Sequence, residues 1–390
     1  MVIGIDGSRA FTRERTGTEN YSYHLITHML ALPEAVAHIF VLFTRPNALI
    51  SPEIRRYANV KVATVPWKYL WTQGGLAGET YNKFQIPNSK FQTGAKKQLL
   101  DVLWIPAHTL PILRRPGLKT VVTIHGLEYR WLPEYRNLLQ RWYLPLSTYY
   151  AARHADRLIC VSQATQRDLV AETQIDIEKT IVIGEGVTRI ANNELRITNN
   201  SRQKVYAQYG IRHSEYVLFV GTVQPRKNVA SLVAAFARAR LPRHYKLVIS
   251  GAIGWMAAAD LAAPHEFEIQ DRVIFTGRVS EVELLTLYQG AALYVQPSWT
   301  EGFGLPVLEA MQAGVPVITS DGGALPEVVG KAGVVVRLGD GFVARLARAI
   351  ERVVGDPVVR RRLVAAGYAR VRRFTWERAA RATLTSLVTV

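Results

Sequence analysis

The sequence predicts an α/β protein of two doubly wound domains, and three observations support this fold class. Short β-branched runs that end in small or polar residues recur along the chain, separated by segments long enough for helices. Strands that are apolar almost throughout are typical of parallel sheets covered on both faces. The pattern occurs twice, and a length of 390 residues suits two domains of ordinary size.

The predicted strands fall into two groups with a linker between them. Those of the first group are the runs at 2–8, 38–44, 60–66, 101–107, 119–126, 157–163 and 180–186. Those of the second group are the runs at 216–222, 246–251, 272–277, 293–298, 315–320 and 333–338. The segment 188–203 is rich in Asn, Thr and charge, which indicates a linker and a boundary near Gly186 to Ser201. The final segment has Thr375 as a candidate N-cap and the pattern of an amphipathic helix.

Composition is that of a globular protein, with 48% hydrophobic and 20% charged residues. The single cysteine, Cys160, excludes an internal disulfide, and the start "MVIGIDGS" lacks the features of a signal peptide. No apolar run approaches the ~18 to 20 residues that a membrane span needs. We therefore expect an intracellular, cytoplasmic protein.

The charge of the chain indicates an anionic partner. Lys and Arg number 48 against 31 Asp and Glu, a formal net charge of +17. Nucleic acid, an anionic lipid surface and a phosphorylated substrate all fit this balance, and so does a plain soluble basic surface. No zinc-finger spacing, RNA-binding aromatic motif or basic heptad accompanies the charge, so nucleic acid is not expected.

The stretch from Pro66 to Leu100 mixes aromatic and basic side chains. This mixture fits an interfacial membrane patch, and it fits a loop that packs on its own domain equally well. The side chains are Trp67, Lys68, Tyr69, Trp71, Tyr81, Lys83, Phe84, Lys90, Lys96 and Lys97.

A basic pair follows the first strand of the second domain. Ligands of open α/β sheets sit at the carboxyl ends of the strands. Arg226 and Lys227 lie there, directly before a helix for which Asn228 is the predicted N-cap. A helix N-terminus already favours anions, so the pair predicts a phosphate site, with an ordinary basic turn as the alternative.

The stretch "EGFGLPVLEA" places two carboxylates, Glu301 and Glu309, around a turn with two glycines and a proline. The glycines let a ligand approach the backbone, and the N–H groups of Phe303, Gly304 and Leu305 would face a negative group or sugar oxygens. Carboxylates accept hydrogen bonds from hydroxyls, so the pattern suits a nucleotide sugar. The alternative is that Glu309 only complements the helix dipole and Glu301 is a solvated loop acid.

A family resemblance joins these motifs. The run from Glu301 to Gly330, with seven residues between Glu301 and Glu309, closely resembles the donor-site signature of the retaining glycosyltransferases of family 4. The segment "VGTVQPRKN" resembles the family's phosphate-binding segment, and "VVTIHG" its N-terminal histidine segment. The resemblance implies the GT-B fold, in which two Rossmann-like doubly wound domains face a cleft and the C-terminal helix crosses back to the first domain. Residues 1–190 with helix 375–390 would bind the acceptor, and residues 201–374 the donor.

The resemblance implies roles in donor binding for residues of the second domain. Lys227 and Arg226 would hold the donor diphosphate and stabilise the leaving group. Many family members have an arginine where this chain has Thr222, and Arg226 can supply the missing charge. Glu309 would bind the ribose, and Glu301 would hold the transferred sugar together with the amides of the glycine turn.

Further roles fall on single residues. His125, at the end of strand "TVVTIHG", would reach the sugar from the first domain, although Gly126 stands where many members have an aspartate. The turn "RTGTENYSYHL" resembles the family's glycine loop, so Gly17 would lie close to the donor phosphate or the acceptor. Variable contacts around Val279 to Leu284 would read the base and the sugar.

The expected reaction is hexosyl transfer without a metal or cofactor. The chain has no Asp-x-Asp motif and no Cys/His cluster with metal spacing. Leaving-group charge would then be met by Lys227, Arg226 and a helix N-terminus, with the anomeric configuration retained. In the family that the chain resembles, the "GTVQPRKN" form is common among mannosyl- and rhamnosyl-type members, so the resemblance favours GDP-mannose as the donor. The net charge and the aromatic, basic region favour a lipid-linked or cell-surface glycan acceptor at the inner face of the membrane.

Three other functions fit parts of the sequence. One is a transferase of soluble sugars or glucans, of the glycogen or sucrose-phosphate synthase type. Another is a two-lobed sugar-binding protein without catalysis, which would not need cations and a helix N-terminus converging on phosphate. A NAD-dependent dehydrogenase would have G-x-G-x-x-G after its first strand, which "GIDGSR" does not supply.

Overall fold

The computed structural model describes residues 1–390 except positions 14, 16, 68, 82–98, 132–137 and 189–196. The chain divides into two compact units. The first unit is Met1–Gly186 with Thr375–Val390, and the second unit is Val187–Phe374. Most of the mixed aromatic and basic stretch 66–100 lies outside the described residues, Lys68, Lys83, Phe84, Lys90, Lys96 and Lys97 among them.

The first unit is built on a seven-stranded parallel sheet in the order β3-β2-β1-β4-β5-β6-β7. Its strands are β1 (Val2–Asp6), β2 (Ile39–Thr44), β3 (Val60–Thr64), β4 (Val102–Ile105), β5 (Lys119–Ile124), β6 (Arg157–Cys160) and β7 (Thr180–Val182). Its helices are α1 (Gly17–Leu30), α2 (Pro52–Arg56), α3 (Ala77–Tyr81), α4 (Leu138–His154), α5 (Gln163–Thr173) and α14 (Trp376–Val388). Short helical turns are η1 (Pro33–Ala37), η2 (Trp71–Leu76), η3 (Glu128–Trp131) and η4 (Ile177–Lys179).

The second unit has a six-stranded parallel sheet in the order β10-β9-β8-β11-β12-β13. Its strands are β8 (Tyr216–Val220), β9 (Lys246–Ser250), β10 (Val273–Gly277), β11 (Leu293–Gln296), β12 (Val317–Ser320) and β13 (Val334–Val336). Its helices are α6 (Asn199–Gln208), α7 (Val229–Arg238), α8 (Ala258–Glu266), α9 (Glu281–Gly290), α10 (Leu305–Gln312), α11 (Leu325–Val329), α12 (Phe342–Gly355) and α13 (Pro357–Val371). Short turns are η5 (Pro225–Lys227), η6 (Gln270–Arg272) and η7 (Gly330–Ala332). Every predicted strand is confirmed, and both sheets reverse their strand order next to their first strand, as doubly wound folds do.

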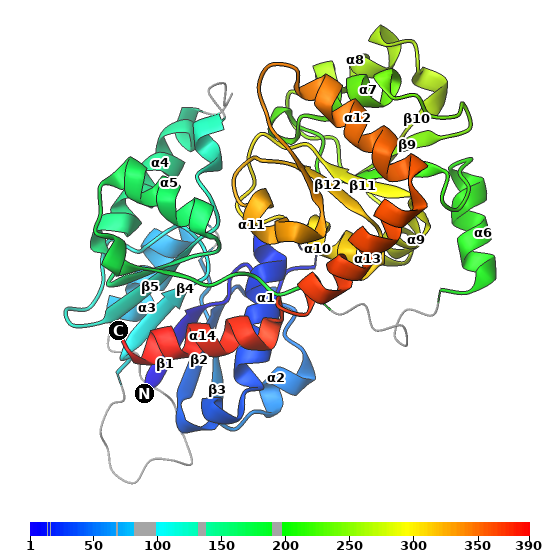
Figure 1. Ribbon diagram of the computed structural model, residues 1–390. Coiled ribbons are helices and arrows are strands. Elements are labelled where there is room, and N and C mark those ends of the chain that lie inside the picture. The colour runs from blue at the N-terminus through cyan, green and yellow to red at the C-terminus, as the bar shows by residue number, and fades with distance from the viewer. Residues whose placement is uncertain (14, 16, 68, 82–98, 132–137, 189–196) are drawn as a thin grey trace. The chain divides into compact units, whose positions relative to one another are not determined.

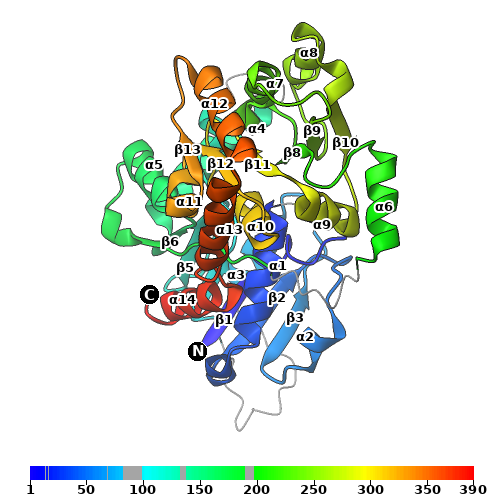
Figure 2. The ribbon, with the colours of Figure 1, turned by 45° about the vertical axis from the view of Figure 1, so that its right-hand side comes forward.

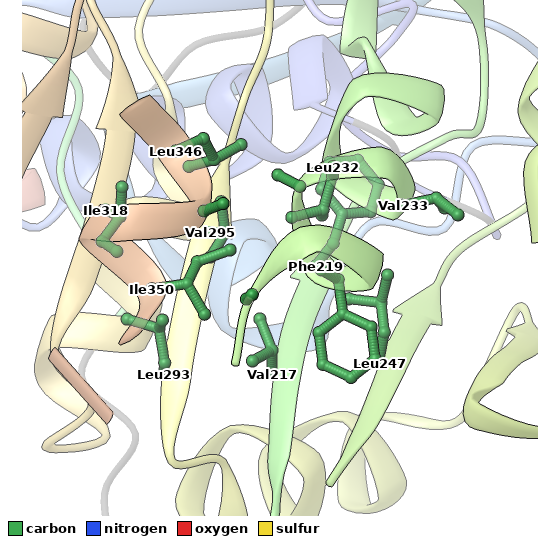
Figure 3. Close-up of a cluster of buried hydrophobic side chains, with 14 of the residues drawn as sticks. Val217, Phe219, Leu232, Val233, Leu247, Leu293, Val295, Ile318, Leu346 and Ile350 are labelled. Carbon is green, nitrogen blue, oxygen red and sulfur yellow. The ribbon is translucent and has the colours of Figure 1, made fainter. Parts of the chain in front are cut away.

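Alternation along the central strands of the second sheet builds two cores. Val217 and Phe219 on β8 face a cluster that includes Leu232 of α7 and Ile350 of α12 (Figure 3). Tyr216 points the other way, and its hydroxyl donates to the carbonyl of Leu287 in α9, 2.6 Å away. Both faces are therefore covered, which explains why the strands are apolar along their whole length.

The C-terminal helix packs on the first unit. Thr375 caps α14, because its side chain accepts from the N–H of Arg378, as predicted. The Trp376 ring stacks on His24 of α1 at 5.3 Å between ring centroids, and Figures 1 and 2 both show α14 lying against α1. Arg157 of β6 donates to the carbonyl of Ser386 at 2.9 Å, which ties the far end of the helix down. Within the described residues, no helix is both long and apolar enough to cross a membrane.

Gly186 is the last residue of the segment Met1–Gly186, and it lies very close to the backbone of Trp376. A Cβ atom placed on Gly186 would lie 2.3 Å from the Trp376 nitrogen and 2.6 Å from its Cα. Because these are backbone atoms, no rotamer change relieves the overlap.

We expect Gly186→Ala to lower the free energy of unfolding by about 1–3 kcal/mol, the usual cost of overpacking. Gly78→Ala is the matched control, because Gly78 lies in α3 with nothing within 4 Å of its Cβ position. That control should be neutral or slightly stabilising. Urea unfolding of both variants measures the difference, and equal midpoints would contradict the assigned contact.

Candidate active site

The candidate site of the second unit lies where its sheet reverses direction. β8 and β11 are neighbours in the sheet, so the segments after them lie together at the carboxyl edge. The first segment carries Arg226 and Lys227 in η5, and the second carries Glu301. Backbone contact joins the two segments, because the Trp299 N–H donates to the Arg226 carbonyl at 2.9 Å. Residues 75 positions apart in the chain therefore share one site.

Glu301 is the buried centre of this site. Its Oε2 accepts from Arg226 Nη1 at 2.8 Å, and its Oε1 accepts from Lys227 Nζ at 2.6 Å. Oε1 also accepts from Ser298 Oγ at 2.6 Å and from Gln296 Nε2 at 2.9 Å. Three of the four donors thus share Oε1, and Arg226 bonds Oε2.

Polar residues of β11 and its extension support Glu301, and the sequence reasoning did not single them out. The Tyr294 hydroxyl donates to Gln296 Oε1, which turns the amide nitrogen of Gln296 toward Glu301. Gln296 and Ser298 share one side of the strand and are fully buried. Their signal in the sequence was two polar residues, two positions apart, at the end of an apolar strand.

Electrostatics keep Glu301 ionised. Burial alone would raise the pKa of this carboxyl, but Lys227 and Arg226 outweigh burial and lower the pKa from 4.5 to about 2. Arg226 is itself buried, and its Nη1 also donates to the Thr300 carbonyl at 2.7 Å. The two cations and the acid therefore form one buried, hydrogen-bonded cluster.

The glycine turn leads directly into α10. Gly304 is its N-cap with φ of 108°, a left-handed conformation that favours glycine. The helix begins at Leu305, so Pro306 occupies its second position. The Val307 N–H donates to the Gly304 carbonyl at 3.0 Å, which closes the first turn of the helix. The amides of Gly304 and Leu305 precede it, at the end of a helix that favours anions.

Phe303 anchors the glycine turn. Its side chain is buried, and its ring packs edge-on against Phe374 with 5.7 Å between centroids. The Ala324 N–H donates to the Glu301 carbonyl at 2.9 Å, so the segment before α11 fixes the other side of the turn. The turn is held in place from both sides.

Glu309 lies one turn into α10 and has a different environment from Glu301. The Tyr288 hydroxyl of α9 donates to Glu309 Oε2 at 2.8 Å. Burial raises the pKa of Glu309, and the bond from Tyr288 opposes this only in part. The two acids of "EGFGLPVLEA" thus have different partners: Glu301 is paired with two cations, and Glu309 accepts from a phenol.

The N-terminus of α7 is satisfied from within the protein: Asn228 holds the N-cap position, as predicted, but its side chain does not cap the helix. Asn228 has φ of 57° and makes no capping bond, and its Nδ2 donates instead to the Pro297 carbonyl at 3.1 Å. The cap is Asp260 of α8, whose Oδ1 accepts from the Ala230 N–H at 2.8 Å. Asp260 thus occupies the helix end where an anion was expected, which leaves the N-terminus of α10 as the candidate anion site beside the cluster.

Val279 is half-buried and lies between β10 and α9. It stands next to Ser280, which caps α9 in a reciprocal capping box with Glu283. This fixes the start of the segment predicted to read the base and the sugar, and that role stays a prediction.

In the first unit, His125 follows β5 and is held by neighbours on several sides. Its backbone N–H donates to His108 Nε2 at 3.1 Å, and its Nε2 lies 2.9 Å from the Pro106 carbonyl. Burial lowers the pKa of His108 to about 3, so that ring is neutral and can accept. His125 Nδ1 lies 3.6 Å from the buried Glu185, which follows β7 and supplies a carboxylate that Gly126 does not. The role of His125 toward a sugar stays a prediction.

Gly17 is the first residue of α1 and is exposed, with nothing within 4 Å of its Cβ position. Of the predicted glycine loop at 15–25, position 16 lies outside the described residues, and the residues from Gly17 on form the start of α1. Space for a ligand therefore exists at Gly17, while its contact with a donor or acceptor stays a prediction.

The first unit also contains a cavity of about 430 Å³ that sequence reasoning missed. It lies at the carboxyl ends of β1 and β4, where this sheet reverses direction. Asp6 lies in its wall, and its Oδ1 accepts from the Ser8 N–H at 3.0 Å and from Trp71 Nε1 at 3.3 Å. Arg45 and Tyr143 also line the cavity. The available signal was the aspartate that ends the first strand.

Metal-binding groups are also relevant to the chemistry. In the described part of the chain, His, Cys, Asp and Glu side chains form no group of three or more that could hold a metal ion. The charged groups identified at the second-unit site are those of Arg226, Lys227, Glu301 and Glu309.

Comparison with known families matches nearly the whole chain in two parts. The family profile described as "Glycosyltransferase Family 4" matches residues 16–189. The profile described as "Glycosyl transferases group 1" matches residues 201–370. The two profiles cover both units and include the cluster of Arg226, Lys227 and Glu301.

Individual proteins are similar over shorter stretches or in fold alone. O-antigen chain mannosyltransferase B of Escherichia coli is 29% identical over 263 residues, which is 66% of this chain and 67% of that protein. Serotype-specific mannosyltransferase WbdA of Escherichia coli is 28% identical over 230 residues, or 57% of this chain, and the matched part is 27% of that protein. The sucrose-phosphate synthase of Thermosynechococcus elongatus has a similar fold, with a TM-score of 0.68, 22% identity and coverage of 98% and 97% of the two chains.

The lowered pKa of Glu301 predicts acid sensitivity. Ionised Glu301 stabilises the folded state above about pH 4.5, and this contribution of about 3 kcal/mol is lost as the pH falls toward about 2. Glu301→Gln should lower the free energy of unfolding at pH 7 by about 3 kcal/mol, because it removes the negative charge that pairs with Arg226 and Lys227.

Urea unfolding between pH 7 and pH 3 measures both effects. The stability of Glu301→Gln should fall less steeply below pH 4.5 than that of the wild type. The control is Glu377→Gln, which removes an exposed acid of α14. If the free energy of unfolding depended on pH in the same way for the wild type and Glu301→Gln, the cluster would not lower the pKa of Glu301.

Proposed function

The chain belongs to the glycosyltransferases of family 4, and from this premise we propose that it transfers a hexose from a nucleotide diphosphate sugar to a lipid-linked or cell-surface glycan. The favoured donor is GDP-mannose, and transfer retains the anomeric configuration and needs neither metal nor cofactor. The observation that carries this proposal is the buried cluster of Arg226, Lys227 and Glu301 beside the N-terminus of α10.

The charge of the cluster suits a diphosphate. Arg226 and Lys227 carry two positive charges, and Glu301 offsets one of them. The remaining positive charge and the amides at the start of α10 would meet the negative charge of the diphosphate. These groups are already fixed before the reaction, so they would stabilise the departing diphosphate at little cost in reorganisation.

Glu301 would act in two stages. Before the donor binds, three donors crowd its Oε1 and Arg226 bonds its Oε2. Lys227 has a flexible stem and can turn to the diphosphate, which would release one position on Oε1. A hydroxyl of the transferred sugar would then donate to that position. Glu301 thus orients the cations first and the sugar afterwards.

Glu309 and the first unit would supply the other contacts. Glu309 would accept from the ribose hydroxyls, with Tyr288 fixing its carboxylate. His125 would contact the transferred sugar. The cavity of the first unit would hold the acceptor, where Asp6 can accept from a hydroxyl while Ser8 and Trp71 hold one of its oxygens.

The transfer itself would follow a front-face path. The bond from the anomeric carbon to the diphosphate oxygen breaks, and the bond to the acceptor oxygen forms on the same face of the sugar. The proton of the acceptor hydroxyl passes to an oxygen of the departing diphosphate. In this path, Lys227 and Arg226 stabilise charge on the leaving group and need not themselves transfer a proton.

The acceptor proposal draws on charge and on the relatives. The net charge of +17 suits an anionic surface, and the similarity to O-antigen chain mannosyltransferase B supports a glycan chain as the acceptor. We therefore place the enzyme in the cytoplasm, peripheral to the inner face of the membrane. The likeness to sucrose-phosphate synthase concerns the fold alone.

A panel of nucleotide sugars tests the donor. GDP-mannose at 100 times its Kd should add about 2.7 kcal/mol of stability. It should also be hydrolysed slowly without acceptor, in the presence or absence of EDTA. Lys227→Met should lose at least tenfold in affinity, because it removes a charge-assisted bond. Calorimetry and nucleotide release measure these results, and NMR of the product reports the anomer. Binding without release of nucleotide would identify a non-catalytic sugar-binding protein.

The two acids should divide the work of donor binding. Glu309→Gln should raise the donor Kd about tenfold with little change in turnover, since it weakens contacts to the ribose. Glu301→Gln should mainly lower turnover. Tyr288→Phe is the control for Glu309, because it removes the supporting hydroxyl and keeps the carboxylate. Equal loss of affinity in both acid variants, with turnover intact, would contradict this division.

A further inference from the structure

Large apolar side chains stand exposed on one surface of the first unit. Trp142 and Leu146 on α4 are 67% and 63% exposed, and Ile112 and Leu113 in the segment after β4 are 60% and 64% exposed. Tyr149, one turn beyond Leu146, is also exposed. We call these five residues the apolar patch. Side chains of this size gather on a surface mainly where it binds a protein or a membrane.

Helical geometry makes the patch continuous. Trp142, Leu146 and Tyr150 follow one another at intervals of four residues, so they share one face of α4. The Tyr150 hydroxyl lies 3.4 Å from the Ile112 carbonyl, and Arg114 Nη1 donates to the same hydroxyl at 3.1 Å. The segment with Ile112 and Leu113 therefore lies beside that face of the helix.

Hydrogen bonds from other parts of the first unit fix the backbone around Ile112 and Leu113. Gln73 Nε2 donates to the Leu110 carbonyl at 3.0 Å, and Gln73 Oε1 accepts from the Ile112 N–H at 2.9 Å. Arg115 Nη2 donates to the Leu100 carbonyl at 2.6 Å. The backbone is thus tied down while the two apolar side chains face solvent. Little conformational entropy remains to be lost when they are buried against another surface.

The formally charged residues of the two segments that carry the patch are all arginines. The segments 109–118 and 138–154 contain four arginines and no aspartate or glutamate. The guanidinium of Arg153 lies over the ring of Tyr149, one of the residues of the apolar patch, 4.4 Å from the ring centroid. Exposed Trp, Tyr, Leu and Ile next to arginines are the residues of interfacial membrane segments.

We propose that the apolar patch inserts into the headgroup region of an anionic phospholipid bilayer, with Arg153 at the lipid phosphates. The absence of acidic side chains from both segments favours lipid over a second copy of this chain, because two such surfaces would bring arginines together. The interfacial role of the stretch 66–100 stays a separate prediction, and its described side chains Trp67, Tyr69 and Tyr81 are exposed as well.

The patch also adjoins the cavity of the first unit. Tyr143, next to Trp142, lines that cavity, and so does Gln73, whose side chain holds Leu110 and Ile112. A lipid carrier in the bilayer could then present its sugar to Asp6 while its lipid stays in the membrane. This last step rests on the proposed function, whereas binding of the patch to lipid does not.

Co-sedimentation with vesicles tests the proposal. The full chain should bind vesicles of phosphatidylcholine and phosphatidylglycerol (7:3) more tightly than vesicles of phosphatidylcholine alone. Ile112→Ser with Leu113→Ser should weaken binding to the mixed vesicles by tenfold or more, because it removes two apolar side chains that the bilayer would bury. Arg153→Gln should weaken that binding about fivefold and leave binding to neutral vesicles unchanged.

The matched control is Val36→Ser with Leu49→Ser, which removes two equally exposed apolar side chains of the same unit outside the patch. It should bind like the wild type. Circular dichroism melting checks folding, and Leu146→Ser provides a second patch variant with an expected loss of threefold or more.

Three outcomes would overturn the proposal. They are wild-type protein that binds neither vesicle, patch variants that bind like the control, and self-association of the wild type without lipid that the double variant abolishes. The assay needs no donor or acceptor, so its failure would leave the proposed transfer standing. Failure of donor hydrolysis would likewise leave lipid binding intact.

Discussion

The buried pairing of Glu301 with Arg226 and Lys227 is the interaction on which the second unit's site depends. Removing three charged groups from water is costly, and the cost is offset only if each charge is paired and hydrogen-bonded. Four donors to one carboxylate meet that condition. The pairing joins the segment after β8 to the segment after β11, and the second of these leads into α10. One acid therefore positions the cations and the helix start that a diphosphate would meet.

Internal carboxylates decide which helix end is available to a ligand. Asp260 accepts from the first turn of α7, so that helix end is satisfied without a ligand. Among the described residues, no side-chain carboxylate is recorded as accepting from the first turn of α10, since Glu301 bonds the cations and Glu309 bonds Tyr288. Both helices begin at the carboxyl edge of one sheet, and tertiary contacts alone distinguish them. The electrostatic character of the site follows from this difference.

In the first unit, too, functional side chains lie at the carboxyl ends of the strands, but they are of other types. Asp6 ends β1 in a cavity with arginine and aromatic side chains, and His125 ends β5 between a carbonyl and the carboxylate of Glu185. The cavity wall continues through Gln73 into the segment that carries Ile112 and Leu113. Hydroxyl-accepting groups and an apolar, basic surface are thus neighbours. This combination suits an acceptor with a sugar at one end and a lipid at the other.

The sequence by itself determined the strands, the two-part organisation and the residues of the donor motif, because these depend on local apolar runs and short spacings. Every predicted strand is present, and Thr375 caps the last helix. Only the tertiary structure decided the partners, such as Asp260 in place of Asn228 as the cap of α7. Glu185 beside His125 and the four donors to Glu301 are of the same kind. These contacts join residues far apart in the chain, and which strand ends meet is set by the order of strands in the sheet, which no local pattern encodes.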